Sequence, residues 1–235
     1  MDPRHVDNLD EKARHGEGAG IGGSPATSPS SRGMVVHWAR RYDLLIWLLT
    51  LGRERRFRER LLHLARLQRG ESVLDVGCGT GTLAIAAKRV VGPEGDVHGV
   101  DASPEMIARA RKKATKAKAD ITFEKAFAQS LPYPDARFDV VLSTVMLHHL
   151  PGKSRLEGVR EMRRVLEPGG RLLAVDLVRS SVKRRGLVAH LHRHGRVEPR
   201  ALIELASGAG LSVVDSGAVG TWDLQFVLAV RDTKA

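Results

Sequence analysis

The feature that most constrains the fold is a short apolar run that carries an acid near its end and leads directly into alternating glycines. The run is Val73 to Val76, and the loop after it reads Gly-Cys-Gly-Thr-Gly over residues 77–81. Such a run predicts a strand buried on both faces, as in a parallel sheet. A helix-forming segment, Leu83 to Val90, comes next. Glycines let bare N–H groups approach a ligand and the helix presents its positive end, so this stretch predicts a cradle for negative or hydroxyl groups.

A second acid closes the next apolar run and narrows the choice of ligand. Asp101 follows Val97 to Val100 and lies twenty residues after Gly81. At the end of a neighbouring strand its carboxylate can accept from both ribose hydroxyls, which favours a nucleoside over a bare phosphate. The loop also differs from a dinucleotide turn, because Thr82 stands where G-x-G-x-x-G has its last small residue. The alternative is a generic α/β turn in which Asp101 begins a helix.

Residues 73–81 resemble the first motif of the class I S-adenosylmethionine-dependent methyltransferases. Leu147 to Leu150 resembles their small-molecule "L-H-H-L" segment, and Leu166 to Leu172 resembles their "L-x-P-G-G-x-L" pattern. Arg41-Tyr42-Asp43 resembles the start of the ubiquinone/menaquinone-biosynthesis C-methyltransferases. The resemblance covers about Tyr42 to Val230. It implies a doubly wound, Rossmann-like α/β fold with a seven-stranded sheet in the order 3-2-1-4-5-7-6, the last strand antiparallel, and N-terminal cap helices.

The same resemblance implies that the chain binds S-adenosylmethionine and releases S-adenosylhomocysteine. The residues that it assigns to the cofactor site are Tyr42, Asp75, Gly77, Cys78, Gly79, Gly81, Asp101, Ala102, Met106, Phe127, Ala128 and Ser143. Phe127 departs from the family, which has at this position an Asp that binds the adenine amino group. Either Phe127 faces the adenine as an apolar wall while the Ala128 N–H reads its ring, or adenine is bound more weakly.

Two histidines lie in the segment that should border the transferred methyl group. His148 is the candidate base, because an imidazole near neutral pKa can take a proton from an acceptor hydroxyl. The alternative is that one histidine bonds the backbone while the other packs at a helix start. No metal is predicted. Hard cations need several oxygen ligands together, and Leu177 follows Asp176 where an Asn would supply another oxygen, as needed by the family's magnesium-dependent enzymes.

The composition separates a tail from a domain. Residues 1–33 are rich in Gly, Ser, Pro and charge and predict a flexible tail, while residues 34–235 form the methyltransferase domain. Within it, residues 34–69 predict two amphipathic helices, the second from Arg53 to Arg69, that cap the site or pack on the sheet edge. The basic, His-rich residues 179–196 predict a lid. A single cysteine, no apolar leader and no apolar run long enough to span a bilayer predict a soluble, cytoplasmic protein.

Two local patterns predict element boundaries. Ser103 and Pro104 predict the start of a helix, with Ser103 as N-cap and Pro104 at the first helical position. Residues 167–171 predict a turn into a strand from Leu172 to Asp176.

The predicted function is transfer of a methyl group to a small, apolar or aromatic acceptor by in-line displacement. Trp38, Trp47, Met146 and Leu147 favour a flat, apolar acceptor. The net charge of +11 and the Arg-rich second helix leave open a nucleic-acid (RNA) methyltransferase, although no N-P-P-Y motif ends the fourth predicted strand. A third reading is a cofactor-binding protein without catalysis, for which Phe127 is the hint.

Overall fold

The computed structural model describes residues 54–177, 199–220 and 223–233. Seven strands in this part of the chain form one sheet. They are β1 (Ser72–Val76), β2 (Asp96–Asp101), β3 (Thr122–Lys125), β4 (Phe138–Thr144), β5 (Leu166–Leu177), β6 (Ser212–Ala218) and β7 (Leu224–Val230). The helices are α2 (Glu54–Leu64), α3 (Thr82–Val91), α4 (Pro104–Ala117), the short 3₁₀ turn η1 (Leu147–His149), α5 (Gly152–Val165) and α7 (Pro199–Gly208).

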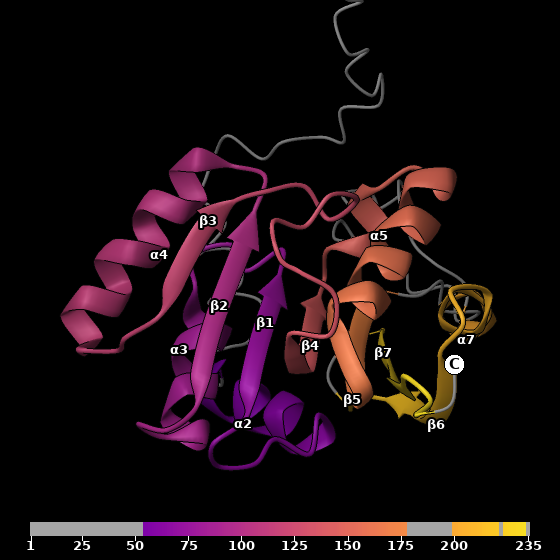
Figure 1. Ribbon diagram of the computed structural model, residues 1–235, viewed down its shortest axis with the longest axis horizontal. Helices are drawn as coiled ribbons and strands as arrows, with labels where there is room; N and C mark the ends of the chain where they lie inside the picture. Colours follow the sequence, from indigo (N-terminus) through magenta and orange to yellow (C-terminus); the bar gives the residue numbers. More distant parts are fainter. Residues whose placement is uncertain (1–53, 178–198, 221–222, 234–235) are drawn as a thin grey trace, which may run out of the picture. The chain divides into compact units, whose positions relative to one another are not determined.

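The strand order is β3-β2-β1-β4-β5-β7-β6 (Figure 1). Pairs among β1 to β5 are parallel, and β7 runs antiparallel to both β5 and β6. The order and the reversed last strand predicted from the resemblance are confirmed. Because the parallel strands all end at one edge, the loops that follow β1, β2 and β4 meet there, which is where ligands bind in open α/β sheets.

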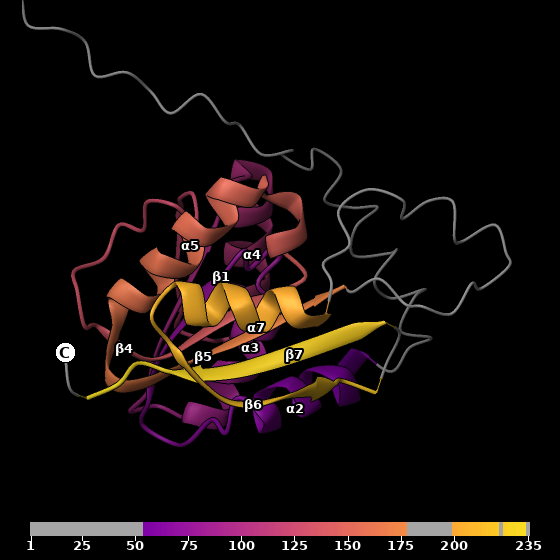
Figure 2. The same cartoon turned by 90° about the vertical axis from the view of Figure 1, so that its right-hand side faces the viewer.

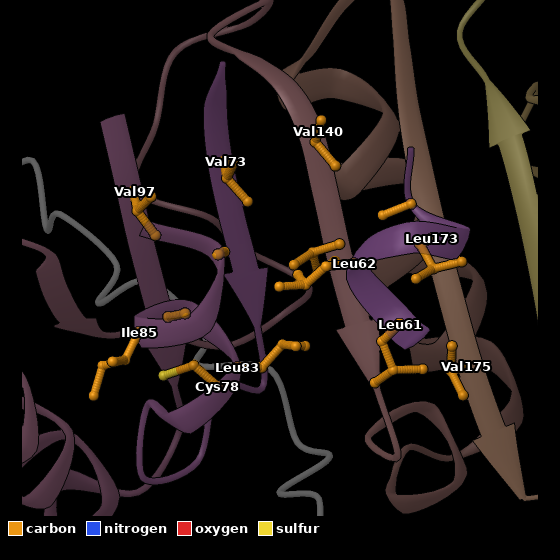
Figure 3. Packing of buried hydrophobic residues seen from close by; sticks show 14 of the residues in the cluster. Leu61, Leu62, Val73, Cys78, Leu83, Ile85, Val97, Val140, Leu173 and Val175 are labelled. Carbon is orange, nitrogen blue, oxygen red and sulfur yellow. The ribbon is translucent and has the colours of Figure 1, made fainter. Parts of the chain in front are cut away.

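Helices cover both faces of the sheet and divide the core in two. One cluster of buried side chains joins α2, α3 and α4 to the sheet, and the other joins α5 and α7 to the opposite face. Figure 2 shows α7 and α2 on opposite sides of β7. Figure 3 shows part of the first cluster, with Leu61 near Leu173 and Val175 and with Val73, Val97 and Val140 on three strands of the sheet. Central strands are therefore buried on both faces, as β1 was predicted to be.

Several element boundaries agree with the sequence and two differ. Ser103 caps α4 by accepting from the Met106 N–H, with Pro104 at the first helical position, as predicted. The second predicted helix, Arg53 to Arg69, ends at Leu64 instead. The predicted turn at residues 167–171 is part of β5, which was expected to begin at Leu172.

The chain after β7 holds residues 167–171 in β5, at the point where the register between β4 and β5 shifts. The Gly169 N–H donates to the Arg231 carbonyl at 2.7 Å, and the Arg231 N–H donates to the Gly170 carbonyl at 2.8 Å. The two glycines relieve the local strain, since Gly169 has a φ of +84° and a Cβ on Gly170 would lie 2.9 Å from the Glu167 carbonyl oxygen. A turn pattern read from sequence does not show that a strand partner comes from sixty residues further on.

The described part of the N-terminal helices packs on the sheet. Leu61, Leu62 and Ala65 are buried in the first cluster. Arg171 on β5 donates to the Ala65 and Arg66 carbonyls at 2.6 and 2.7 Å, fixing the C-terminal end of α2. The predicted tail (1–33), the first cap helix, Tyr42 and the lid (179–196) lie outside the described residues. Within the described ranges no helix is both long and apolar enough to cross a bilayer.

Candidate functional site

The glycine loop after β1 is held against β2 by its own backbone. The Gly77 and Cys78 N–H groups donate to the Val100 carbonyl at 2.8 and 2.9 Å. The Gly79 N–H donates to Asp101 Oδ2 at 2.9 Å. The sequence led us to expect these N–H groups to face a ligand, and that expectation is wrong for all three. The loop therefore presents bare Cα surface, and the carboxylate of Asp101 becomes its main polar group.

Two loop positions require glycine for two different reasons. Both Gly77 and Gly81 have left-handed φ angles, +76° and +73°. A Cβ on Gly77 would lie 2.4 Å from Met146 Cγ, so the Met146 side chain lies directly on this bare backbone. A Cβ on Gly81 would lie 2.7 Å from Phe123 and 2.9 Å from Ala110, so Gly81 permits close packing of the first turn of α3. Gly77 thus shapes the site, whereas Gly81 shapes the core behind it.

Asp101 is fixed at the end of β2 by two backbone N–H groups. Its Oδ1 accepts from the Ser103 N–H at 2.8 Å and its Oδ2 accepts from the Gly79 N–H at 2.9 Å. Burial raises the pKa of this carboxyl, and the same two N–H groups oppose the rise. Each oxygen of an ionised carboxylate retains a free lone pair. Asp101 can therefore accept two further hydrogen bonds from a pair of adjacent hydroxyls without moving.

A cavity opens beyond the carboxyl ends of β1, β2 and β4. Its lining consists of Val76, Gly77, Gly79, Val100, Asp101, Ala102, Ser103, Met106, Ala126, Phe127, Ala128, Gln129, Val145, Met146, His149 and Leu150. The structure thus brings together most of the predicted cofactor residues: Gly77, Gly79, Asp101, Ala102, Met106, Phe127 and Ala128. The Phe127 side chain is 48% exposed, which is unusual for a large apolar residue and leaves its ring free to cover a flat ligand.

The other predicted cofactor residues within the described ranges, Asp75, Cys78, Gly81 and Ser143, lie behind the lining. Cys78 is buried in the first core cluster, and burial, followed by the charges of Asp75 and Asp101, raises the pKa of its thiol. This favours the packing role over a nucleophilic one. Asp75 is 2% exposed, and its Oδ2 has no hydrogen-bond partner. Burial and the nearby Asp101 raise the pKa of Asp75 to about 7, opposed by the Ala84 N–H. Ser143 Oγ is also buried without a partner.

The two histidines of η1 point to different surroundings. His148 is anchored to Asp176, which is fully buried at the end of β5: Nδ1 lies 2.6 Å from Oδ1, and the His148 backbone N–H donates to Oδ2 at 2.8 Å. An ionised carboxylate only accepts, so Nδ1 carries the hydrogen and Nε2 is left as an acceptor. His149, not His148, belongs to the cavity lining, and the two rings lie 3.9 Å apart between centroids.

His149 is a neutral wall residue near pH 7. Burial, together with the neighbouring His148, lowers the pKa of His149 to about 4, and Asp176 opposes the change. Sequence reasoning placed both histidines near the methyl group but could not choose between them. The choice depends on how the chain leaves β4, because a 3₁₀ turn separates successive side chains by about 120°.

That exit from β4 is strained. Val145 has a φ of +53°, a left-handed value that is a genuine outlier for a β-branched residue. Conformations of this kind cost about 1–3 kcal/mol and persist only where the surroundings hold them. Here the Val145 N–H donates to the Val175 carbonyl at 2.7 Å. Val145 was not singled out from the sequence, because nothing in its neighbours signals a left-handed residue.

The comparisons with known proteins agree with this geometry. Residues 73–170 match the family described as "Methyltransferase domain". The chain is 38% identical over 143 residues to a demethylmenaquinone methyltransferase of Thermus thermophilus, covering 61% of this chain and 64% of that one. It is 41% identical over 125 residues to the 27-O-demethylrifamycin SV methyltransferase of Amycolatopsis mediterranei, covering 52% and 44%. The chain thus spans less than two thirds of the length of these curated relatives.

Among solved structures, an S-adenosylmethionine-dependent methyltransferase from Aquifex aeolicus has a TM-score of 0.65 at 24% identity, covering 74% of this chain and 89% of that one. Residues 73–170 therefore match a methyltransferase domain, and the described part of the chain shares the fold of that S-adenosylmethionine-dependent methyltransferase. The chain is also similar to the ubiquinone/menaquinone biosynthesis C-methyltransferase of Pseudomonas paraeruginosa. The two are 35% identical over 145 residues, which covers 61% of this chain and 56% of that one.

The residues that line and back the cavity suit S-adenosylmethionine as the methyl donor. The hydroxyl pair of a ribose matches the two free lone pairs of Asp101. The orphaned oxygen of Asp75 and the orphaned hydroxyl of Ser143 lie at the ends of β1 and β4, where a buried polar group needs a partner such as a ligand ammonium or a bridging water. The bare Cα of Gly77 and the side chain of Met106 supply apolar surface in the same cavity as Asp101.

Proposed function

We propose that the protein transfers a methyl group from S-adenosylmethionine to a small, apolar or aromatic acceptor by in-line displacement. One observation carries the proposal. A single cavity joins the bare loop and Asp101 to a wall of apolar side chains, Val145, Met146 and Leu150, with the neutral imidazole of His149 among them. A polar nucleoside end and an apolar end in one cavity fit two ligands that meet in the middle.

The donor supplies a methyl group already activated on a sulfonium, so this chain's residues mainly position and desolvate. In the proposal Asp101 holds the ribose hydroxyls, and Met106, Phe127 and Ala128 enclose the adenine. Phe127 replaces a hydrogen bond with apolar contact there. Asp75 balances the donor's positive charge from behind the loop, directly or through water.

The acceptor class follows from the wall and from the relatives. Two of the relatives are named for a demethylated menaquinone and for 27-O-demethylrifamycin SV as the molecules that they methylate. An apolar wall with few hydrogen-bonding groups suits a flat ring system, since such a ring loses little on leaving water. We infer a quinone-type or phenolic acceptor for this chain.

His148 is the proposed base. When the acceptor carries a hydroxyl, its proton must leave as the new bond to the methyl carbon forms. With Nδ1–H committed to Asp176, the acceptor nitrogen Nε2 is the free proton site of His148. The protonated ring would then be stabilised by a buried carboxylate. His149 lies in the cavity wall, with its ring centroid 3.9 Å from that of His148. The lowered pKa of His149 makes it a weak base at neutral pH, so we assign it to the wall and not to proton transfer.

Nucleic acid as the acceptor remains the alternative reading, but several basic side chains of the described helices are directed inward. Arg155 donates to the Leu147 and Leu150 carbonyls, both at 2.9 Å, and Arg111 donates to the Phe123 carbonyl. Arg163 donates to the Gly210 carbonyl at 2.9 Å. Guanidinium groups committed to backbone carbonyls brace the fold and have fewer donors left for phosphates. The positive charge is therefore weaker support for RNA than its total suggests.

Calorimetric titration of the full chain with S-adenosylhomocysteine tests the cofactor, and transfer of an isotope-labelled methyl group to a panel of quinols, phenols and RNA tests the acceptor. We expect micromolar binding and labelling of quinols or phenols, with a turnover insensitive to salt. Labelling of RNA, with binding that falls steeply as salt rises, would instead establish the alternative. Tight cofactor binding without transfer to any acceptor would indicate a non-catalytic protein.

A further inference from the structure

The backbone at Val145 places two side chains of the cavity wall on opposite faces of the sheet. Val145 packs against the core cluster on the α2–α3–α4 side, and the next residue, Met146, packs against the cluster on the α5–α7 side. Both residues line the cavity. A left-handed residue at the end of a strand turns the chain sharply, and this turn leads directly into η1.

Met146 connects this turn to the glycine loop. Its Cγ occupies the space that a Cβ on Gly77 would need, 2.4 Å from that ideal position. Gly77 in turn is held to β2 through the Val100 carbonyl. The exit from β4 and the loop after β1 are thus in direct contact, and a change in the direction of one would open the contact with the other.

A valine is an unfavourable choice for this backbone conformation unless rigidity matters. Glycine adopts a φ of +53° without penalty, but it also adopts most other φ values. A β-branched residue has few alternatives, so once the Val145 N–H bond to Val175 and the core contacts hold it in this region, its direction is narrowly defined. Strain of this kind is found where a structure must be kept in one arrangement.

We propose that Val145 is a positioning residue whose left-handed backbone fixes Met146 against Gly77 and holds η1 at the cavity wall. This role rests on the proposed function, because the wall it positions is the one that the donor and acceptor would share. The strain is not needed to terminate β4, since any turn residue would do that.

The test compares Val145→Gly with Val145→Ala in the full chain. Both variants lose the two Val145 methyl groups that pack on the core, so apart from the single Cβ that alanine keeps they differ in how freely residue 145 can leave its left-handed conformation. Ala136→Gly is the matched control, because Ala136 has nearly the same φ, +52°, on the exposed surface away from the cavity. Three quantities are measured: the urea midpoint, hydrogen exchange of the amides of residues 146–150, and affinity for S-adenosylhomocysteine.

We expect Val145→Gly to have a higher urea midpoint than Val145→Ala, as expected when strain is relieved, yet to bind S-adenosylhomocysteine about three- to tenfold more weakly. Amides of residues 146–150 should exchange faster in Val145→Gly alone. Ala136→Gly should raise the urea midpoint and leave affinity and exchange unchanged. Equal affinity and equal exchange in the two Val145 variants would overturn the proposal. If the unaltered protein does not bind S-adenosylhomocysteine, the proposed function fails, and the exchange comparison still decides the role of Val145.

Discussion

His148 and Asp176 form a buried pair in which one carboxylate makes two contacts with the same residue. Asp176 Oδ1 lies 2.6 Å from His148 Nδ1, and Oδ2 accepts from the His148 backbone N–H at 2.8 Å. Oδ1 also accepts from the Leu177 N–H at 2.7 Å. The ring and the backbone of His148 are therefore fixed together. Both contacts come from Asp176 on β5, a strand that follows η1 in the chain by nearly thirty residues.

The first prediction concerns this pair. Asp176→Asn keeps the side-chain volume but has only one accepting oxygen for three donors, so the His148 ring loses its fixed tautomer. We expect the rate of methyl transfer to fall on the order of a hundredfold, at the lower end of the range of general-base effects. Steady-state kinetics with the best acceptor of the panel measures it.

A change in kcat with little change in donor affinity is the expected signature. His148→Asn should lower kcat to a similar degree, and the double variant should lose little more, because the two residues act as one unit. His149→Asn should instead raise the acceptor KM. An Asp176→Asn variant with full activity would remove His148 as the base.

The second prediction concerns Asp101. Asp101→Asn keeps one accepting oxygen and replaces the other with a donor that faces the Gly79 N–H, so both the loop contact and a ribose contact are lost. We expect S-adenosylhomocysteine to bind about ten- to a hundredfold more weakly, since hydrogen bonds to charged groups contribute about 1.5–3 kcal/mol. Titration calorimetry measures it, with Asp215→Asn, a partly exposed acid on β6, as control. Unchanged affinity in Asp101→Asn would contradict the assignment of the ribose.

The third prediction is a pH dependence that comes from Asp75. Its folded pKa of about 7 lies above the ordinary value of 3.8, so the folded state keeps a proton that the unfolded state releases. This contribution to stability is fully present below pH 4 and is lost as the pH rises to about 7. Asp75→Asn removes that loss. We expect its free energy of unfolding, relative to the unaltered protein, to rise between pH 5 and pH 8 by a few kcal/mol, at most about 4.

Urea unfolding of both proteins across this range measures the difference. Parallel pH profiles would show that Asp75 is ionised throughout the range in the folded protein. A donor that carries positive charge should bind more tightly as Asp75 ionises, so S-adenosylmethionine affinity should increase through the same range in the unaltered protein but not in Asp75→Asn.

The fourth prediction separates two glycines. Gly81→Ala introduces a Cβ 2.7 Å from Phe123 at a φ of +73°, so it adds both a clash and backbone strain. We expect it to lower the free energy of unfolding by about 2–4 kcal/mol. Gly152→Ala is the control: it has nothing within 4 Å of the new Cβ and no left-handed φ, and it lies at the start of α5. It should stabilise by about 0.5–1 kcal/mol. Thermal and urea unfolding measure both, and an equal response would show that the first turn of α3 adjusts freely.

The sequence was most informative where one local pattern determines the structure. The strand followed by glycines in residues 73–81 and the cap at Ser103 follow from rules that act over a few residues, and the structure confirms them. The strand order needed the family resemblance, because no local pattern shows which strands pair. The β5 start at Leu166 was missed because Leu166 pairs with Phe138 and the next residues bond to Arg231, and both partners lie far along the chain.

The site shows the same limit. Asp101 could be placed because strand ends meet at one edge of the sheet. The direction of the loop N–H groups could not be predicted, because it depends on the Val100 carbonyl of the neighbouring strand. Which histidine borders the cavity depends on the φ angle of Val145, a tertiary constraint with no signature in the surrounding residues.

The contact of the Val100 carbonyl with two loop amides has a consequence for turnover. Because the protein itself occupies these donors, the loop needs no nucleoside to complete its bonding and keeps its curvature when the site empties. In the proposed reaction, product can leave and a fresh donor can enter a groove of unchanged form, so the ordering that a new round requires falls on parts of the chain other than this bend.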